Sequence, residues 1–63
     1  MSRVNIRTKI LELLQRTTGT NSQIAMRLGS TTNEVARATN RMRKEGGIKE
    51  VGKEDGRSIW GKA

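Results

Sequence analysis

The fold is decided by residues 20–35, which read TNSQIAMRLGSTTNEV. This stretch contains two capping boxes, in which a Thr side chain and a Gln or Glu three residues later satisfy each other's backbone amides at a helix start. The first box joins Thr20 to Gln23, and the second joins Thr31 to Glu34. Between the boxes stands a glycine, which readily takes the left-handed conformation that ends a helix. The stretch therefore predicts a short helix, a tight turn and the start of another helix.

Upstream of this stretch, residues 5–16 have the apolar periodicity of a helix, with Ile10 and Leu14 on one face. Asn5 or Ser2 is placed to cap its start. The two threonines and the glycine that follow suit a short extended link or a brief strand. The sequence thus predicts three helices in succession.

The third predicted helix runs from its cap at Thr31 to about Lys44 or Glu45, where Gly46 and Gly47 stop it. At the helical period, its inward side combines apolar residues with one threonine. The members of this inward stripe are Val35, Ala38, Thr39 and Met42.

After the third helix the pattern changes to two strands, over residues 48–53 and 57–60. Asp55-Gly56 between them predicts a hairpin, because a type I′ turn needs positive φ at both central residues. That turn places Lys53 opposite Ser58. A three-residue turn would shift this register.

The same register places Val51 opposite Trp60 on one face of the hairpin. Ile48 and Ile59 then share the other face, which we assign to the core. Trp60, the single aromatic residue, is expected to pack against Val51 and the stem of a third-helix side chain.

Length and charge bound the class of protein. The chain has 63 residues, so one domain over residues 1–63 is expected. Thirteen Lys and Arg stand against six Asp and Glu, a formal net charge of +7. A field of this sign attracts polyanions, nucleic acid first and an anionic membrane surface second. The alternative is that the charge serves solubility alone.

Composition also argues against several kinds of chemistry. There is no cysteine and no histidine, so we expect no disulfide, no metal site and no cofactor. The acids are not paired, and no glycine-rich loop cradles a phosphate, so we expect no catalytic residue, no small-molecule substrate and no enzyme. No apolar run approaches the roughly 18 residues of a membrane span, and no signal peptide is evident. We therefore expect a cytoplasmic protein without a membrane partner.

The order helix, helix, tight turn, helix, hairpin resembles the winged helix-turn-helix family of transcription regulators. In that family a capped helix reads Ile/Leu-Ala-x-x-Leu-Gly, followed by a turn, a Ser/Thr cap and an apolar residue four positions on, and residues 20–35 keep all of these features. The resemblance covers about residues 5–61. It implies an α+β fold with three helices and a C-terminal β-hairpin wing, a DNA-reading third helix and, often, a dimer.

The outer face of the third helix carries the candidate readers of DNA. At about 100° per residue, its Asn, Arg and Lys side chains fall opposite the inward stripe, without an acid among them. Asn can bond adenine bidentately, and Arg can bond guanine. An ordinary solvated helix would instead mix Glu with Lys. The candidates on this helix are Thr32, Asn33, Arg37, Asn40, Arg41 and Lys44.

Further candidates lie outside the third helix. Lys53 and Arg57 sit in and beside the hairpin turn, where they could meet phosphates, although nearby acids dilute their charge. Arg27 is a phosphate candidate implied by the family resemblance. Arg3 and Arg7 could add backbone contacts, or could simply form a basic end.

A narrower resemblance is to the Zα domains, which bind left-handed duplexes. Those domains need an Asn and a Tyr on the third helix and prolines in the wing, whereas an ungapped alignment places Ala36 and Asn40 at the two helix positions and the chain has no proline. Arg37 and Trp60 do match.

Taken together, these features predict a sequence-specific regulator of transcription that binds double-stranded DNA and acts as a repressor. We expect a homodimer or cooperative binding, because one helix contacts few base pairs. The expected setting is the nucleoid of a bacterial or phage-infected cell. The alternatives are a protein-interaction module on the same fold, a non-specific DNA or double-stranded RNA binder, and a Z-form binder.

Overall fold

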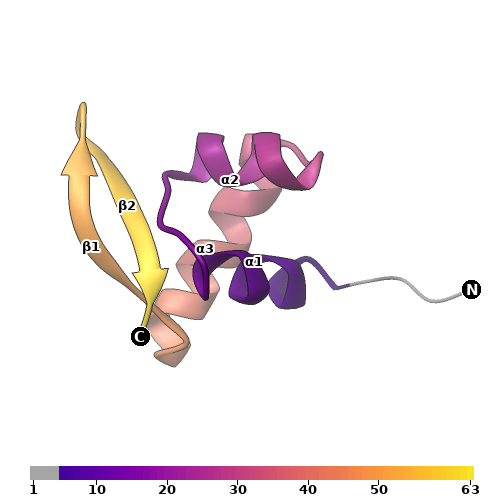
Figure 1. The fold of residues 1–63 in the computed structure, drawn as a ribbon, viewed down its shortest axis with the longest axis horizontal. Coiled ribbons are helices and arrows are strands. Elements are labelled where there is room, and N and C mark those ends of the chain that lie inside the picture. The colour runs from indigo at the N-terminus through magenta and orange to yellow at the C-terminus, as the bar shows by residue number, and fades with distance from the viewer. Residues whose placement is uncertain (1–4) are drawn as a thin grey trace, which may run out of the picture.

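Three helices precede a two-stranded antiparallel sheet in the computed structural model, which describes residues 5–63 (Figure 1). The elements are α1 (Ile6–Leu14), α2 (Asn21–Leu28), α3 (Thr32–Glu45), β1 (Ile48–Glu54) and β2 (Arg57–Lys62). This is the α+β layout of a winged helix, so the predicted fold class is confirmed. Ser2 and Arg3, named above as a possible cap and a possible contact, lie outside the described residues.

The helix starts predicted by the two capping boxes are confirmed. In α2, the Thr20 hydroxyl accepts the Gln23 amide at 3.3 Å, and the Gln23 side chain accepts the Thr20 amide at 3.0 Å. In α3, Thr31 and Glu34 make the same reciprocal pair, each at 3.2 Å. Gly29 ends α2 with φ of 69°, a left-handed conformation that glycine adopts without a steric penalty. These local bonds set the tight turn between α2 and α3.

The helix α1 begins where predicted and ends earlier. The Asn5 side chain accepts the Arg7 amide at 2.9 Å and caps the helix. The helix stops at Leu14 rather than at residue 16, because the chain turns and then straightens toward the hairpin. Gly19 and Trp60 form an antiparallel bridge with N···O distances of 2.8 and 3.2 Å. The extended link after α1 therefore pairs with β2 through this single bridge, outside the two-stranded sheet.

One core joins the helices to the hairpin. Its buried apolar members are Ile10, Leu14, Ile24, Ala25, Val35, Met42, Ile48 and Trp60. Three of the four residues of the predicted inward stripe of α3 are fully buried, and Ala38 is half-buried. The orientation of α3 therefore follows its apolar periodicity.

The hairpin turn has the predicted type. Asp55 and Gly56 have φ of 52° and 77°, as a two-residue type I′ turn requires. Next to the turn, Lys53 pairs with Ser58, as predicted.

Farther from the turn, the predicted register is wrong. A β-bulge at Val51 makes Glu50, rather than Val51, the partner of Trp60. The extra residue reverses which side chains of the strand face inward. Ile48 and Trp60 consequently lie in the core, whereas Ile59 is only partly buried.

Packing around the bulge explains this outcome. Val51 is 47% exposed and lies over Gly61, where an added Cβ would stand 2.8 Å from the Val51 Cγ1. Trp60 buries more apolar area than Ile59 could in the same place, and its N–H has a partner there. The prediction that Trp60 is a packing residue is thus confirmed, but the expectation that it faces Val51 is wrong.

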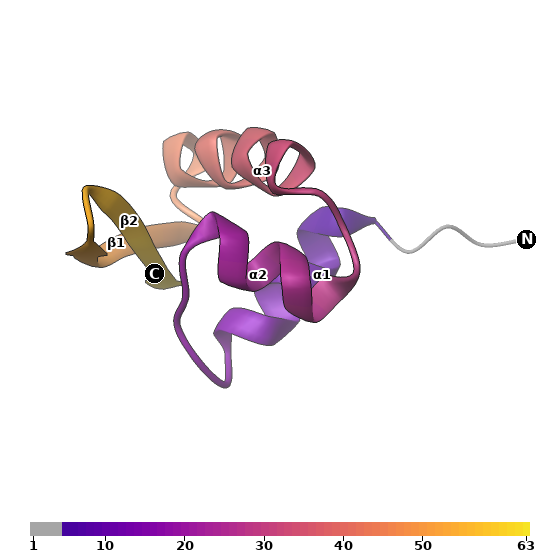
Figure 2. The same ribbon diagram turned by 90° about the horizontal axis from the view of Figure 1, so that it is seen from above.

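The helices leave one side of α3 uncovered. Figure 2 shows α3 along one side of the molecule, with α1 and α2 together on its inner side and the hairpin beyond its C-terminal end. No ribbon crosses the other side of α3 in this view. The face predicted to read DNA is therefore accessible.

Candidate nucleic-acid interface

The outer face of α3 is exposed along its whole length. The central row of this face consists of Asn33, Arg37, Asn40 and Lys44, all of them exposed. Thr32 and Arg41, which border the row, are exposed as well. The sequence-predicted residues of α3 thus form one continuous polar and cationic surface.

Both acidic residues of α3 are occupied within the protein. The Glu34 carboxylate accepts the Thr31 amide and lies 3.1 Å from the Thr31 hydroxyl. The Glu45 carboxylate pairs with the Arg7 guanidinium at 2.6 Å, the one ion pair found within residues 5–63. The Arg and Lys residues of the outer face consequently have no carboxylate partner in this part of the chain. Their charge is available to an external anion.

The ion pair with Glu45 gives Arg7 a different role from the one expected from the sequence. As a free cation, Arg7 was a candidate for a backbone contact. It instead bridges α1 to the last turn of α3, and its charge is largely balanced there. Arg7 therefore contributes to the positive charge of the outer face indirectly, because it pairs with the Glu45 carboxylate.

Unlike the two acids of α3, the acidic residues of the hairpin are not all bonded to partners within the protein. Glu50 accepts a hydrogen bond from the Ser58 hydroxyl at 2.7 Å. Glu54 and Asp55, at the turn, are exposed and form no ion pair within residues 5–63. They lie beside Lys53 and Arg57, both exposed. The tip of the hairpin therefore carries mixed charge, whereas the outer face of α3 is cationic.

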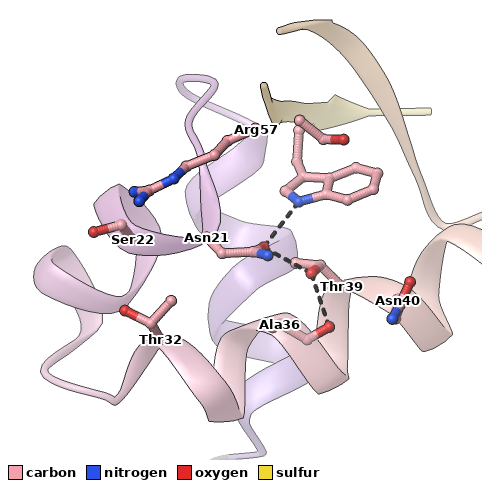
Figure 3. Close-up of a pocket in the computed structure, with 9 residues that line it drawn as sticks. Asn21, Ser22, Thr32, Ala36, Thr39, Asn40 and Arg57 are labelled. Carbon is pink, nitrogen blue, oxygen red and sulfur yellow. Dashed lines mark hydrogen bonds between the residues drawn. The ribbon is translucent and has the colours of Figure 1, made fainter. Parts of the chain in front are cut away.

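An open hollow lies between the start of α2, one flank of α3 and β2 (Figure 3). Its polar lining comes from all three elements and includes Asn21, Ser22, Thr32, Asn40 and Arg57. We call it the α2–α3–β2 hollow. It brings together three of the predicted site residues, two from α3 and one from the hairpin, that are distant in sequence.

A hydrogen-bond network forms the floor of this hollow. The Asn21 Oδ1 accepts the Trp60 indole N–H at 2.8 Å and the Thr39 hydroxyl at 2.8 Å (Figure 3). Thr39 is fully buried and Trp60 nearly so. The network ties α2, α3 and β2 together, so the three walls of the hollow are held at fixed positions.

The remaining predicted residues lie elsewhere. Arg37 and Arg41 border a second depression, on the flank of α3 that faces α1. Arg27, near the end of α2, lines a separate shallow surface together with Met26. The structure thus does not bring Arg27 to the α2–α3–β2 hollow.

Sequence reasoning missed Asn21 and Ser22 as site residues. Both lie in the helix-turn-helix segment, but nothing in their local pattern distinguishes them from ordinary first-turn helix residues. Their place in the hollow depends on a contact with Trp60, which is 39 positions from Asn21. No local sequence signal reports a contact of that range.

Other kinds of site find no support in the described part of the chain. Residues 5–63 contain no cluster of three or more potential carboxylate, thiolate or imidazole metal ligands. Over the same residues, no helix has the length and apolarity needed to cross a membrane. No protein-family model, curated protein or solved structure matches this chain.

Proposed function

We propose that this protein is a sequence-specific regulator of transcription that binds double-stranded DNA and acts as a repressor. In this proposal α3 lies in the major groove, and the hairpin contacts the sugar–phosphate backbone. The observation that carries the proposal is the outer face of α3, which is exposed, cationic and uncovered by other elements.

Dimensions support this arrangement. α3 has 14 residues, which corresponds to about 21 Å at the usual helical rise. A major groove about 12 Å wide admits a helix of this kind. Ala36 is a small residue on the flank of α3 and is half-buried, so it does not hinder a close approach of the helix to the base edges.

The chemistry of the outer face supports base reading. Asn33, Arg37 and Asn40 are exposed along one row. Arg donates two parallel hydrogen bonds to guanine, and Asn pairs with both a donor and an acceptor of adenine. A purely phosphate-binding surface would need only cations, and here amides alternate with cations.

The decisive experiment is selection of bound sequences from a library of random duplexes, using the full chain. The expected result is a consensus site. If the protein binds as a two-fold dimer, the consensus contains inverted half-sites centred about 10 base pairs apart. A library that remains random after selection, despite retained binding, would identify a non-specific binder.

Salt dependence separates the other possibilities. If about five phosphates are contacted, the log–log slope of affinity against salt is about −4.5. Weak, salt-insensitive association with every duplex would favour the protein-interaction module. Selective binding of an alternating CG duplex, with conversion to the left-handed form in circular dichroism, would identify a Z-form binder.

A further inference from the structure

The amide of Asn21 is oriented unambiguously by its neighbours. The Trp60 indole N–H can only donate a hydrogen bond, so the Asn21 atom 2.8 Å away must be the oxygen. The Thr39 hydroxyl donates to the same oxygen, also at 2.8 Å. Both lone-pair directions of this oxygen are therefore occupied.

The other end of the same amide is unused. The amide group is planar, so the Nδ2 group of Asn21 lies on the side away from those two donors. It makes no hydrogen bond within residues 5–63 (Figure 3). Asn21 lines the α2–α3–β2 hollow and is only half-buried. Two N–H donors are thus available there on a group whose position is already held.

The rest of the polar lining favours an anion. Hydroxyl groups come from Ser22, Thr32 and Ser58, an amide from Asn40 and a guanidinium from Arg57. The Ser58 hydroxyl already donates to the Glu50 carboxylate at 2.7 Å, so the donors free to meet a ligand are those of the other four residues. No carboxylate is among the lining residues. The hollow is also at the start of α2, whose first turn has no acid, so the positive end of the helix dipole is not compensated there.

Negative charge lies on the other side of Arg57. A smaller neighbouring depression is bordered by Glu54 and Asp55 and by Arg57 and Ser22, which both also line the larger hollow. Arg57 therefore stands between the two carboxylates and the α2–α3–β2 hollow. Its guanidinium forms no ion pair with either one within 4.0 Å, so it can face an anion in the larger hollow.

From this geometry we infer that the α2–α3–β2 hollow binds one backbone phosphodiester of the DNA, with the Asn21 amide as a fixed donor and Arg57 as the countercharge. The inference rests on the proposed function and deepens it, because it assigns the wall between α3 and the hairpin to a particular group of the ligand. A hollow of about 680 Å³ has room for a phosphodiester and its neighbouring sugars. The amide donor loses little conformational freedom on binding, since Trp60 and Thr39 already hold it.

The test variant is Asn21→Asp. One carboxylate oxygen can still accept from Trp60 and Thr39, while the other replaces the donor group with a negatively charged acceptor. An acid in the first turn of α2 also interacts favourably with the helix dipole. The thermal midpoint should therefore stay the same or rise. Affinity for the selected duplex should fall about tenfold, as expected for loss of a hydrogen bond to a charged group, and the salt slope should decrease by about 0.9.

The matched control is Gln15→Glu. It makes the same change from amide to carboxylate and the same change in net charge, at an exposed residue just after α1 that does not line the hollow. Affinity should change by less than about twofold, and the salt slope should be preserved. Equal losses of affinity in the two variants would show that only the net charge matters, and would overturn the inference.

A second measurement uses the unmodified protein. In a titration with the selected duplex, followed by ¹⁵N NMR, the side-chain amide signals of Asn21 should shift while the Trp60 indole signal stays protected from exchange. Inorganic phosphate alone should shift the same amide signals only weakly, and only at millimolar concentration. The concentration needed for the shift therefore distinguishes binding of a free anion from binding of a DNA phosphodiester.

The outcomes distinguish the two proposals. If signals of α3 move with duplex and those of the Asn21 amide do not, DNA binding stands and the phosphate site is wrong. If no duplex shifts any NMR signal, the proposed function is wrong, and the phosphate site is wrong as well.

Discussion

The helix α3 and the tip of the hairpin have similar compositions but different electrostatics. Both contain Lys or Arg together with acids. On α3, Glu34 is held by its own helix cap and Glu45 by Arg7. At the hairpin turn, Glu54 and Asp55 remain exposed and unpaired within residues 5–63. The comparison shows that net charge alone does not locate a binding face, because what matters is which acids are already occupied.

The two regions also differ in how they are held. α3 is fixed by a buried stripe along its length, whereas the hairpin is fixed mainly at its base, by Ile48 and Trp60. Its tip carries no buried side chain and borders an open depression beside the start of α2 (Figure 1). A rigid helix suits base reading, which needs exact geometry, and a less constrained tip suits phosphate contact, which tolerates adjustment. The predictions that follow test this division, from the largest expected effect to the smallest.

The largest effect is expected from breaking the anchor of the hairpin. Trp60→Ala removes a large core side chain and the hydrogen bond to Asn21, so it should lower the free energy of unfolding by about 3–5 kcal/mol. Urea denaturation followed by circular dichroism measures this loss. The control is Val51→Ala in the same hairpin, where the exposed side chain should cost less than about 1 kcal/mol. Similar losses for both would favour the register in which Val51 and Trp60 are partners.

The next effect concerns base reading by α3. Arg37→Ala should weaken binding to the selected duplex by about 1–3 kcal/mol and relax the base preference at one position. The control, Arg16→Ala, removes the same charge from an exposed residue after α1, and should have a smaller effect that does not depend on sequence. Fluorescence anisotropy with matched and mismatched duplexes measures both. An equal loss on every duplex would make Arg37 a phosphate contact.

A smaller effect is expected at the hairpin tip. Lys53→Ala should weaken binding to all duplexes alike and reduce the salt slope by about 0.9, because a phosphate contact carries no sequence information. The measurement is the slope of log affinity against log salt concentration on two unrelated duplexes. An unchanged slope would show that this side of the hairpin does not touch the backbone.

The smallest effect tests the unpaired acids. Asp55→Asn removes one negative charge from the turn and keeps a residue that tolerates the positive φ of 52°. Stability should be unchanged, and affinity for DNA should rise about twofold, as expected for one exposed charge. Titrations at low and high salt measure this gain, which should shrink at high salt. A drop in affinity would instead indicate that the Asp55 carboxylate makes a favourable contact with DNA.

Much of the fold could be predicted from local sequence signals. The two capping boxes, the glycine stops and the Asp55-Gly56 turn depend on bonds between residues a few positions apart, and the structure contains all of them. The outward row of α3 follows from periodicity in the same way. The end of α1 was less predictable, because the bridge between Gly19 and Trp60 decides where the chain straightens.

The candidate site was predictable only in part. Thr32, Asn40 and Arg57 were identified as candidates, but their meeting in one hollow was not foreseen. Arg7 had seemed a free cation, and its role depends on Glu45, which is 38 positions away. In both cases the missing information was a contact between distant segments.

By itself, the sequence determined the order of the three helices, the caps of α2 and α3, the type of hairpin turn and the cationic side of α3, because each of these depends on neighbours along the chain. Only the tertiary structure decided the bulge at Val51, the burial of Trp60, the pairing of Glu45 with Arg7 and the orientation of the Asn21 amide. These features arise where packing brings separate segments together, and the most favourable combination of buried area and satisfied hydrogen bonds then selects among arrangements that the local sequence allows equally.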